Sequence, residues 1–138
     1  MSRLTFDANQ RFKQLDEGLL YASAGVQTNC SGIAAILVRI CSIDSLTLEY
    51  KAVTEPKLDD SEALGLFSGE QTPKAYVEAV FDGAREMFRA AQINGGYRVE
   101  LVQTLIHPVD ARVIKFREAG MRAARGWLTD VGLMSPPL

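Results

Sequence analysis

Residues 72–96 read TPKAYVEAVFDGAREMFRAAQINGG, a stretch that predicts one long amphipathic helix with a clear start and a clear stop. Thr72 and Pro73 are typical of a helix start, because threonine can cap free amide groups and proline at the first helical position needs no amide partner. Residues 94–96 are typical of a turn, so we expect the helix to end near Gln92. The apolar residues recur at spacings of three and four, as on one buried stripe: Val77, Val80, Phe81, Ala84, Met87, Phe88 and Ala91.

Three strands are expected before this helix. The first, at 19–26, leads into the polar segment 27–32, whose sequence QTNCSG contains typical turn residues. The second, at 33–43, is apolar on both alternating faces, which predicts a strand covered on both sides. The third, at 46–53, alternates apolar and polar residues, and residues 44–45 are expected to join it to the second strand as a hairpin.

The other segments follow from the same patterns. Residues 55–71 are acidic and contain proline and glycine, so we expect a loop with at most one helical turn. A fourth strand is predicted at 97–106, because its apolar positions continue until a histidine-proline pair carries the chain out of the sheet. Asp110 is a candidate cap for a second helix from 111 to about 129, with one buried stripe. The members of that stripe are Val113, Phe116, Gly120, Ala124 and Trp127.

These elements predict an α+β fold with the order βββαβα. Two helices would cover one face of a four-stranded, mainly antiparallel sheet. The chain has 138 residues and a hydrophobic fraction of 47%, which suits a single domain over 1–138 with a core at about 19–129 and a tail at 130–138.

Composition argues against several classes of protein. The longest apolar stretch, 33–43, is far shorter than a membrane-spanning helix, and residues 1–12 lack the apolar centre of a secretory signal, so we expect a cytoplasmic protein without membrane contact. Cys30 and Cys41 are not in a CxxC arrangement and the chain has one histidine, so we expect free thiols, no metal and no cofactor. The Asp59-Asp60-Glu62 cluster lacks the spacing of a calcium loop.

The formal charge is −2, but its distribution is uneven. Residues 44–70 contain seven acids and two lysines, whereas residues 98–128 contain six bases and three acids. Lys115, Arg122 and Arg125 share one face of the second predicted helix, where they could bind phosphate or simply form a solvated surface. The second interpretation is favoured, because Glu118 lies on the same face.

Three segments, in this order, resemble the fourth domain of elongation factor G. Residues 27–32 resemble a loop of the form QTGGSG or QSGGRG, and residues 72–80 resemble a helix start of the form IPKEYIPAV, with similarity continuing through 83–86. Residues 107–110 read HPVD and resemble a turn of the form H[DP]VDS. The following helix also matches, at Phe116, Ala119, Gly120 and Ala123. Together the similar segments cover roughly residues 26–124.

The resemblance implies a ribosomal protein S5 domain 2-like fold with a left-handed crossover. It also implies that the two turns meet at one tip, which in that family contacts RNA in the decoding region of the ribosome. Gln27 and His107 match family residues of that tip, so we expect them at the same end of the molecule. The RNA-contacting candidates carry donors and acceptors suited to sugar and phosphate contacts: Gln27, Thr28, Asn29, Ser31, His107 and Arg112. The alternative is a purely structural role, with residues 27–31 forming a hairpin turn and His107 closing a strand.

The sequence also departs from that family. Asn29 and Cys30 replace two glycines, and Ala111 and Arg112 replace two serines. No phosphate-binding motif of the form GxxxxGK[ST] is present, so we expect no GTP binding by this chain.

Two functions from different classes follow. The first is a non-catalytic protein associated with RNA or the ribosome in translation, in which His107 titrates near neutral pH and a neighbouring phosphate favours its cationic form. The second is a repurposed domain for protein association, because two helices cannot cover both faces of the sheet and the apolar positions of residues 3–15 are few. A symmetric dimer would bury the second face. Enzymatic activity is not expected, since Ser31 with His107 would form an incomplete catalytic pair.

Overall fold

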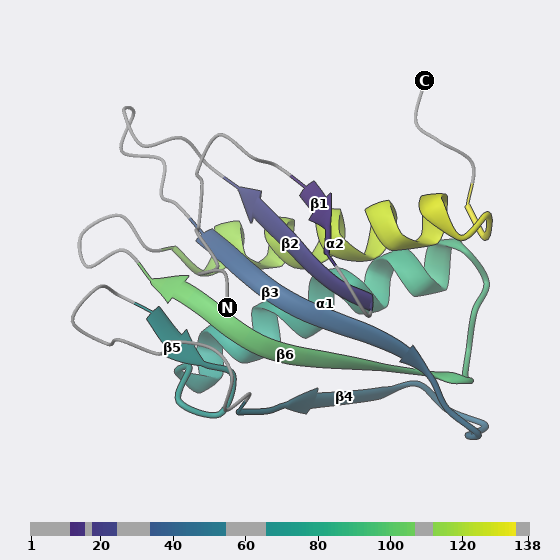
Figure 1. Ribbon diagram of the computed structural model, residues 1–138, viewed down its shortest axis with the longest axis horizontal. Coiled ribbons are helices and arrows are strands. Elements are labelled where there is room, and N and C mark those ends of the chain that lie inside the picture. The colour runs from purple at the N-terminus through teal and green to yellow at the C-terminus, as the bar shows by residue number, and fades with distance from the viewer. Residues whose placement is uncertain (1–11, 16–17, 25–33, 55–65, 107–111, 135–138) are drawn as a thin grey trace.

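The computed structural model describes residues 12–15, 18–24, 34–54, 66–106 and 112–134. Within them the elements are β1 (Phe12–Gln14), β2 (Leu19–Ala24), β3 (Ala34–Ser42), β4 (Glu49–Ala52), β5 (Leu66–Ser68), α1 (Lys74–Ala90), β6 (Tyr97–Ile106) and α2 (Val113–Asp130). Both helices lie side by side against one face of a mixed sheet (Figure 1). The expected α+β class, with both helices on one face, is therefore confirmed.

The sheet differs from the expected one in its number of strands and in their order. Six strands occur in the described residues, in the order β1-β2-β3-β6-β4, with β5 also paired to β6. The prediction of four strands missed β1 and β5, each of which has only three residues and too few positions for a recognisable alternation.

The predicted hairpin between the second and third strands is wrong. β6 lies between β3 and β4, pairing antiparallel with β3 and parallel with β4. β6 is ten residues long and pairs along the whole of β3, so β4 takes the free edge on the other side of β6. Local turn residues at 44–45 favoured the hairpin, and the longer pairing of β3 with β6 overrides them.

The connection from β4 to β6 passes through β5 and α1. In Figure 1 the helices lie behind the sheet, the chain leaves β4 at the lower edge, and it returns in β6 above β4. This crossover is left-handed, whereas connections between parallel strands of one sheet are right-handed in almost all proteins.

The start of α1 is organised differently from the predicted threonine cap. Pro73 occupies the cap position, and no side chain caps the helix. The buried Thr72 hydroxyl instead donates to the Ser68 carbonyl oxygen at 2.7 Å and lies 2.7 Å from the Thr104 hydroxyl. Thr72 therefore links β5 to β6. Its hydroxyl bonds to groups of the sheet in place of the free amide groups at the start of the helix.

α2 begins and ends close to its expected bounds. Arg112 occupies its cap position but its side chain does not cap the helix, and Asp110, the expected cap, lies outside the described residues. Val113 is 49% exposed, so its expected place in the buried stripe is wrong. The rest of the stripe is confirmed, and Trp127 packs against Phe88 and Tyr97 in the core between helices and sheet. Neither helix of the described part has an apolar stretch long enough to cross a membrane.

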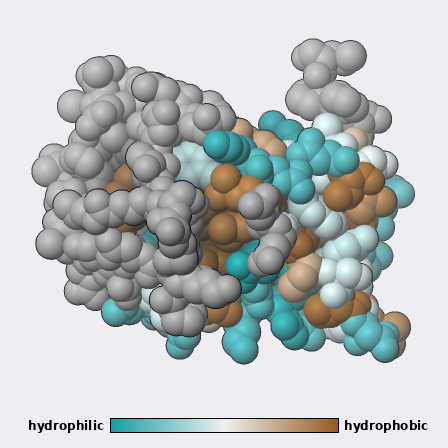
Figure 2. All heavy atoms as spheres, in the orientation of Figure 1, coloured by the Kyte–Doolittle hydropathy of each residue, from teal (hydrophilic) through white to brown (hydrophobic). Residues whose placement is uncertain are grey.

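The face of the sheet away from the helices is also apolar. Figure 2 looks onto this face and shows hydrophobic side chains near its middle. Tyr21, Ala35, Leu37 and Val102 form a buried cluster there, with Leu15 among the partly buried residues packed against it. These side chains are buried within a single chain, so they do not form the exposed apolar patch from which a dimer was inferred. The dimer itself stays a prediction.

The two helices approach each other through glycine. A Cβ atom added at Gly83 of α1 would lie 2.1 Å from the carbonyl oxygen of Arg117 in α2. A Cβ atom at Gly120 of α2 would lie 2.2 Å from the carbonyl oxygen of Val80 in α1. Each helix therefore presses its backbone against the glycine of the other, and buried alanines surround the contact.

We expect Gly120→Ala to lower the free energy of unfolding by about 2 kcal/mol, because the added methyl group overpacks a contact with backbone atoms. Helix propensity alone predicts the opposite sign, a gain of roughly 1 kcal/mol for alanine over glycine. Urea denaturation followed by circular dichroism measures the difference. A more stable variant would show that the close contact of the helices is not required.

Candidate functional site

The two loops with the predicted tip residues attach to one end of the sheet. Ala34, the first residue of β3, pairs with Ala24 at the end of β2 and with Ile106 at the end of β6. Residues 25–33 therefore leave and re-enter the sheet directly beside the point where residues 107–111 leave it (Figure 1). We call this row of residues the loop end of the molecule. The candidates Gln27, Thr28, Asn29, Ser31 and His107 lie outside the described residues.

The start of α2 adds positive potential at this end. Figure 1 shows that α2 begins on the side of the molecule where β2 and β6 end. Arg112, at the cap position, is exposed, and its side chain does not cap the helix. The first turn of α2 contains no acidic residue. Free amide groups at a helix N-terminus favour an anion, and here no carboxylate of the first turn satisfies them.

The expected phosphate-binding face of α2 is largely committed to other contacts. Lys115 pairs with Glu118 at 3.4 Å, and its side chain is 19% exposed. The guanidinium group of Arg122 donates to the carbonyl oxygen of Ser23 in β2, which holds α2 against the sheet. Arg125 is exposed and forms no ion pair with the described residues. The three side chains therefore do not make a surface of uncommitted cations.

Negative charge also reaches the loop end. Leu66 of β5 pairs with Leu105 of β6, one residue from Ile106, so the acidic segment 55–65 re-enters the sheet beside this end. That segment contains Glu55, Asp59, Asp60 and Glu62 but only one lysine. Its carboxylates lower the positive potential near this end.

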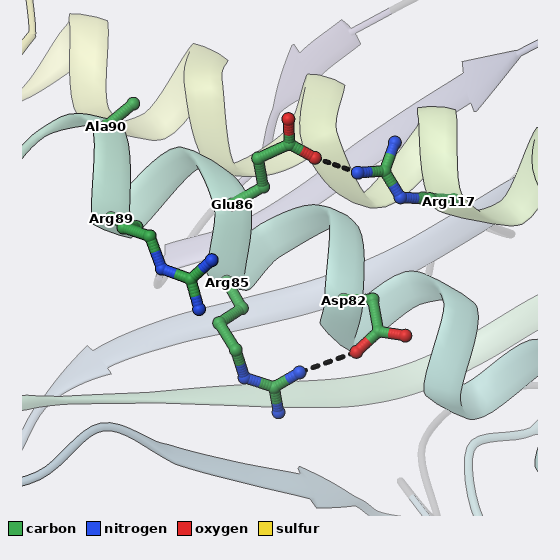
Figure 3. A pocket seen from close by; sticks show the side chains of 6 residues that line it. All are labelled: Asp82, Arg85, Glu86, Arg89, Ala90 and Arg117. Atoms are coloured by element: carbon green, nitrogen blue, oxygen red, sulfur yellow. Dashed lines mark hydrogen bonds and ion pairs between the residues drawn. The ribbon is translucent and has the colours of Figure 1, made fainter.

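Sequence reasoning missed a groove lined by charged residues of α1 and α2 (Figure 3). Arg85 pairs with Asp82 at 2.6 Å within α1, and Arg117 of α2 forms an ion pair with Glu86 of α1. Arg89 lines the same groove. The spacing of residues 82, 85, 86 and 89 on one helix face was visible in the sequence. The contribution of Arg117 was not, because it depends on how the two helices cross.

The described residues offer few groups for catalysis. Burial raises the pKa of the Cys41 thiol, and the negative charge of Glu100 raises it further, so the thiol stays protonated at neutral pH. Arg98 donates to Glu49, which raises the pKa of its guanidinium group. No group of three histidine, cysteine, aspartate or glutamate side chains that could hold a metal ion occurs among the described residues.

We expect Arg122→Ala to lower the free energy of unfolding by about 1 to 2 kcal/mol, because it removes a charge-assisted hydrogen bond to the Ser23 carbonyl oxygen. Arg125→Ala is the matched control on the same helix and should change stability by less than about 0.5 kcal/mol. Thermal and urea unfolding of both variants measure the effect. Equal stabilities would contradict a structural role for Arg122.

No protein-family model matches this sequence, and no curated protein matches it. Among solved structures, the fold is similar to part of a protein from Thermus thermophilus whose crystal structure is known. The TM-score is 0.51 over 80% of this chain, with 14% sequence identity. This chain spans 16% of the length of the Thermus chain. The likeness shows that the α+β fold of this chain also occurs as part of a much longer protein.

Proposed function

We propose that this chain is a non-catalytic RNA-binding protein that associates with the ribosome through the loop end. The observation that carries the proposal is the pairing of Ala24 and Ile106 with Ala34, which anchors the two loops that resemble the RNA-contacting tip of elongation factor G side by side. The start of α2, whose cap residue Arg112 makes no capping hydrogen bond, lies on the same side of the molecule.

The arrangement of the elements supports a closer relationship to that domain. The core strands, α1 and α2 follow the βββαβα order of the ribosomal protein S5 domain 2-like fold, with β1 and β5 as additions. The left-handed crossover through α1 is rare, and the resemblance to the elongation factor domain implied it. Of the three similar segments, the described one contains the start of α1, which begins at Lys74 directly after Thr72 and Pro73.

The chemistry of the loop end suits phosphate and sugar contacts. Arg112 supplies a guanidinium group, and the first amides of α2 supply hydrogen-bond donors directed along a helix axis. His107 would add a cation whose charge a neighbouring phosphate stabilises. Gln27, Thr28, Asn29 and Ser31 would add neutral donors and acceptors of the kind used for ribose and base edges.

The function would be passive binding at equilibrium. The sequence lacks a phosphate loop for GTP, so no energy source within this chain would drive movement on the ribosome. Binding to the site used by the corresponding domain of the elongation factor would occupy it and exclude other ligands. Such a role places the protein in the cytoplasm and in translation.

Protein association is the alternative, and dimerisation is its specific form. The second face of the sheet is buried in one chain, so the driving force proposed for a sheet-to-sheet dimer is reduced. Light scattering at high protein concentration tests it. The burial of Leu37 and Val102 removes the exposed patch from which the dimer was inferred, and a stable dimer would favour the association function.

We expect His107→Ala to weaken co-sedimentation with ribosomes more than Lys115→Ala does, because Lys115 is already paired with Glu118 whereas His107 belongs to a loop anchored at the loop end. The experiment compares about 50 and about 200 mM salt, since phosphate contacts weaken steeply over this range. Equal small losses for both variants would indicate nonspecific attraction. Binding that is insensitive to salt would contradict the proposal.

A further inference from the structure

The groove between α1 and α2 brings together three guanidinium groups. None of them belongs to the loop segments 25–33 and 107–111. Arg85 and Arg89 come from one face of α1, and Arg117 comes from α2 (Figure 3). Two carboxylates, Asp82 and Glu86, line the groove with them. Three positive charges therefore face two negative charges, and one positive charge is in excess.

Arg89 carries that excess. It is exposed, and it forms no ion pair with the residues that the structure describes. The other two arginines form ion pairs with carboxylates at the protein surface. The side chains of Arg85 and Arg117 are each 43% exposed, and ion pairs at such exposure contribute little to stability. All three guanidinium groups are therefore accessible to an anionic ligand without a large loss of folding energy.

A second hollow continues from this groove toward β4. Arg85 and Arg89 line both, and the second hollow adds Leu48, Tyr50 and Ile93. The guanidinium carbon of Arg85 lies 4.6 Å from the centre of the Tyr50 ring. This cation–π contact orients the planar guanidinium group, whose other side can stack against a base.

Tyr50 adds a polar group to this hollow. Its hydroxyl oxygen is buried and has no hydrogen-bond partner among the described residues. Burial raises the pKa of the Tyr50 hydroxyl, so it remains a donor at neutral pH. The hollow thus combines apolar walls and a stacking plane beside a cationic groove, with the Tyr50 hydroxyl buried behind them.

We propose that the groove and the adjoining hollow bind single-stranded RNA, with phosphates on Arg89 and Arg117 and a base against Arg85. This inference rests on the proposed RNA-binding function and adds a second surface to it. Single-stranded RNA is favoured because its alternation of charge and planar base matches a cationic groove beside an apolar hollow. An acidic peptide offers the charge but no planar group for Arg85.

The test uses Arg89→Ala and a labelled oligouridylate of about 12 nucleotides, with binding measured by fluorescence anisotropy at several salt concentrations. Arg125→Ala is the matched control, since it removes one exposed arginine from α2 outside the groove. We expect Arg89→Ala to weaken binding about fivefold and to reduce the slope of log affinity against log salt by about 0.7, the value for one phosphate of a single strand. The control should change the affinity less than about twofold.

Equal effects of the Arg89→Ala and Arg125→Ala variants would overturn the inference. His107→Ala, measured in parallel, separates the two proposals. If only His107→Ala loses binding, RNA binding in the groove is contradicted and RNA binding at the loop end is supported. If only Arg89→Ala loses binding, RNA binding at the loop end is contradicted and RNA binding in the groove is supported. A wild-type chain that binds no oligouridylate would overturn both.

Polyglutamate is added as a competitor of the oligouridylate, at an equal concentration of negative charge. Displacement of the RNA by polyglutamate from wild-type protein, but not from Arg89→Ala, would show that the groove takes an acidic peptide instead. Failure of polyglutamate to displace the RNA would support the inference. Arg89→Glu provides a second variant, for which a larger loss of RNA binding than for Arg89→Ala is expected.

Discussion

The close contact of α1 and α2 at Gly83 and Gly120 is the constraint on which the rest of the molecule depends. Each glycine lies against a carbonyl oxygen of the other helix, so any larger residue would force the helices apart. With this contact, both helices fit on one face of the sheet and bury Phe88 and Phe116 against it. The position of α2 in turn brings its start to the loop end and brings Arg117 to Glu86 on α1.

Local patterns predicted the helices, because an apolar stripe is set by helix geometry and the core confirms most of both stripes. They also predicted that the strand at 33–43 is covered on both faces. They could not predict strand order, since the placement of β6 between β3 and β4 depends on pairing between distant segments. The Thr72 hydroxyl shows the same limit, because it lies 2.7 Å from the hydroxyl of Thr104 in β6, which is 32 residues away in the sequence. The role of the loop-end residues in RNA binding stays a prediction. The place of Arg117 in the groove could be found only from the structure, because it depends on how the two helices cross.

The resemblance to the elongation factor domain involves segments of the two helices and two loops, and these have different physical explanations. Gly83 and Gly120 both fall in similar segments, and both are explained by helix packing. Those segments are therefore explained by helix packing and carry no information about ligands. The functional part rests on the two loops, whose anchors meet at Ala34. The acidic segment that precedes Leu66 joins the sheet near the same end, and its charge would oppose an anionic ligand there.

Photo-crosslinking to an RNA that contains 4-thiouridine, followed by mass spectrometry of the linked peptides, tests the location of binding most directly. The account predicts crosslinks in residues 25–33 and 107–112, at the loop end, and in the part of α1 that carries Arg85 and Arg89. Figure 1 shows that the turn between β3 and β4 lies at the opposite end of the sheet. Crosslinks confined to that turn, at residues 43–48, would contradict the central claim.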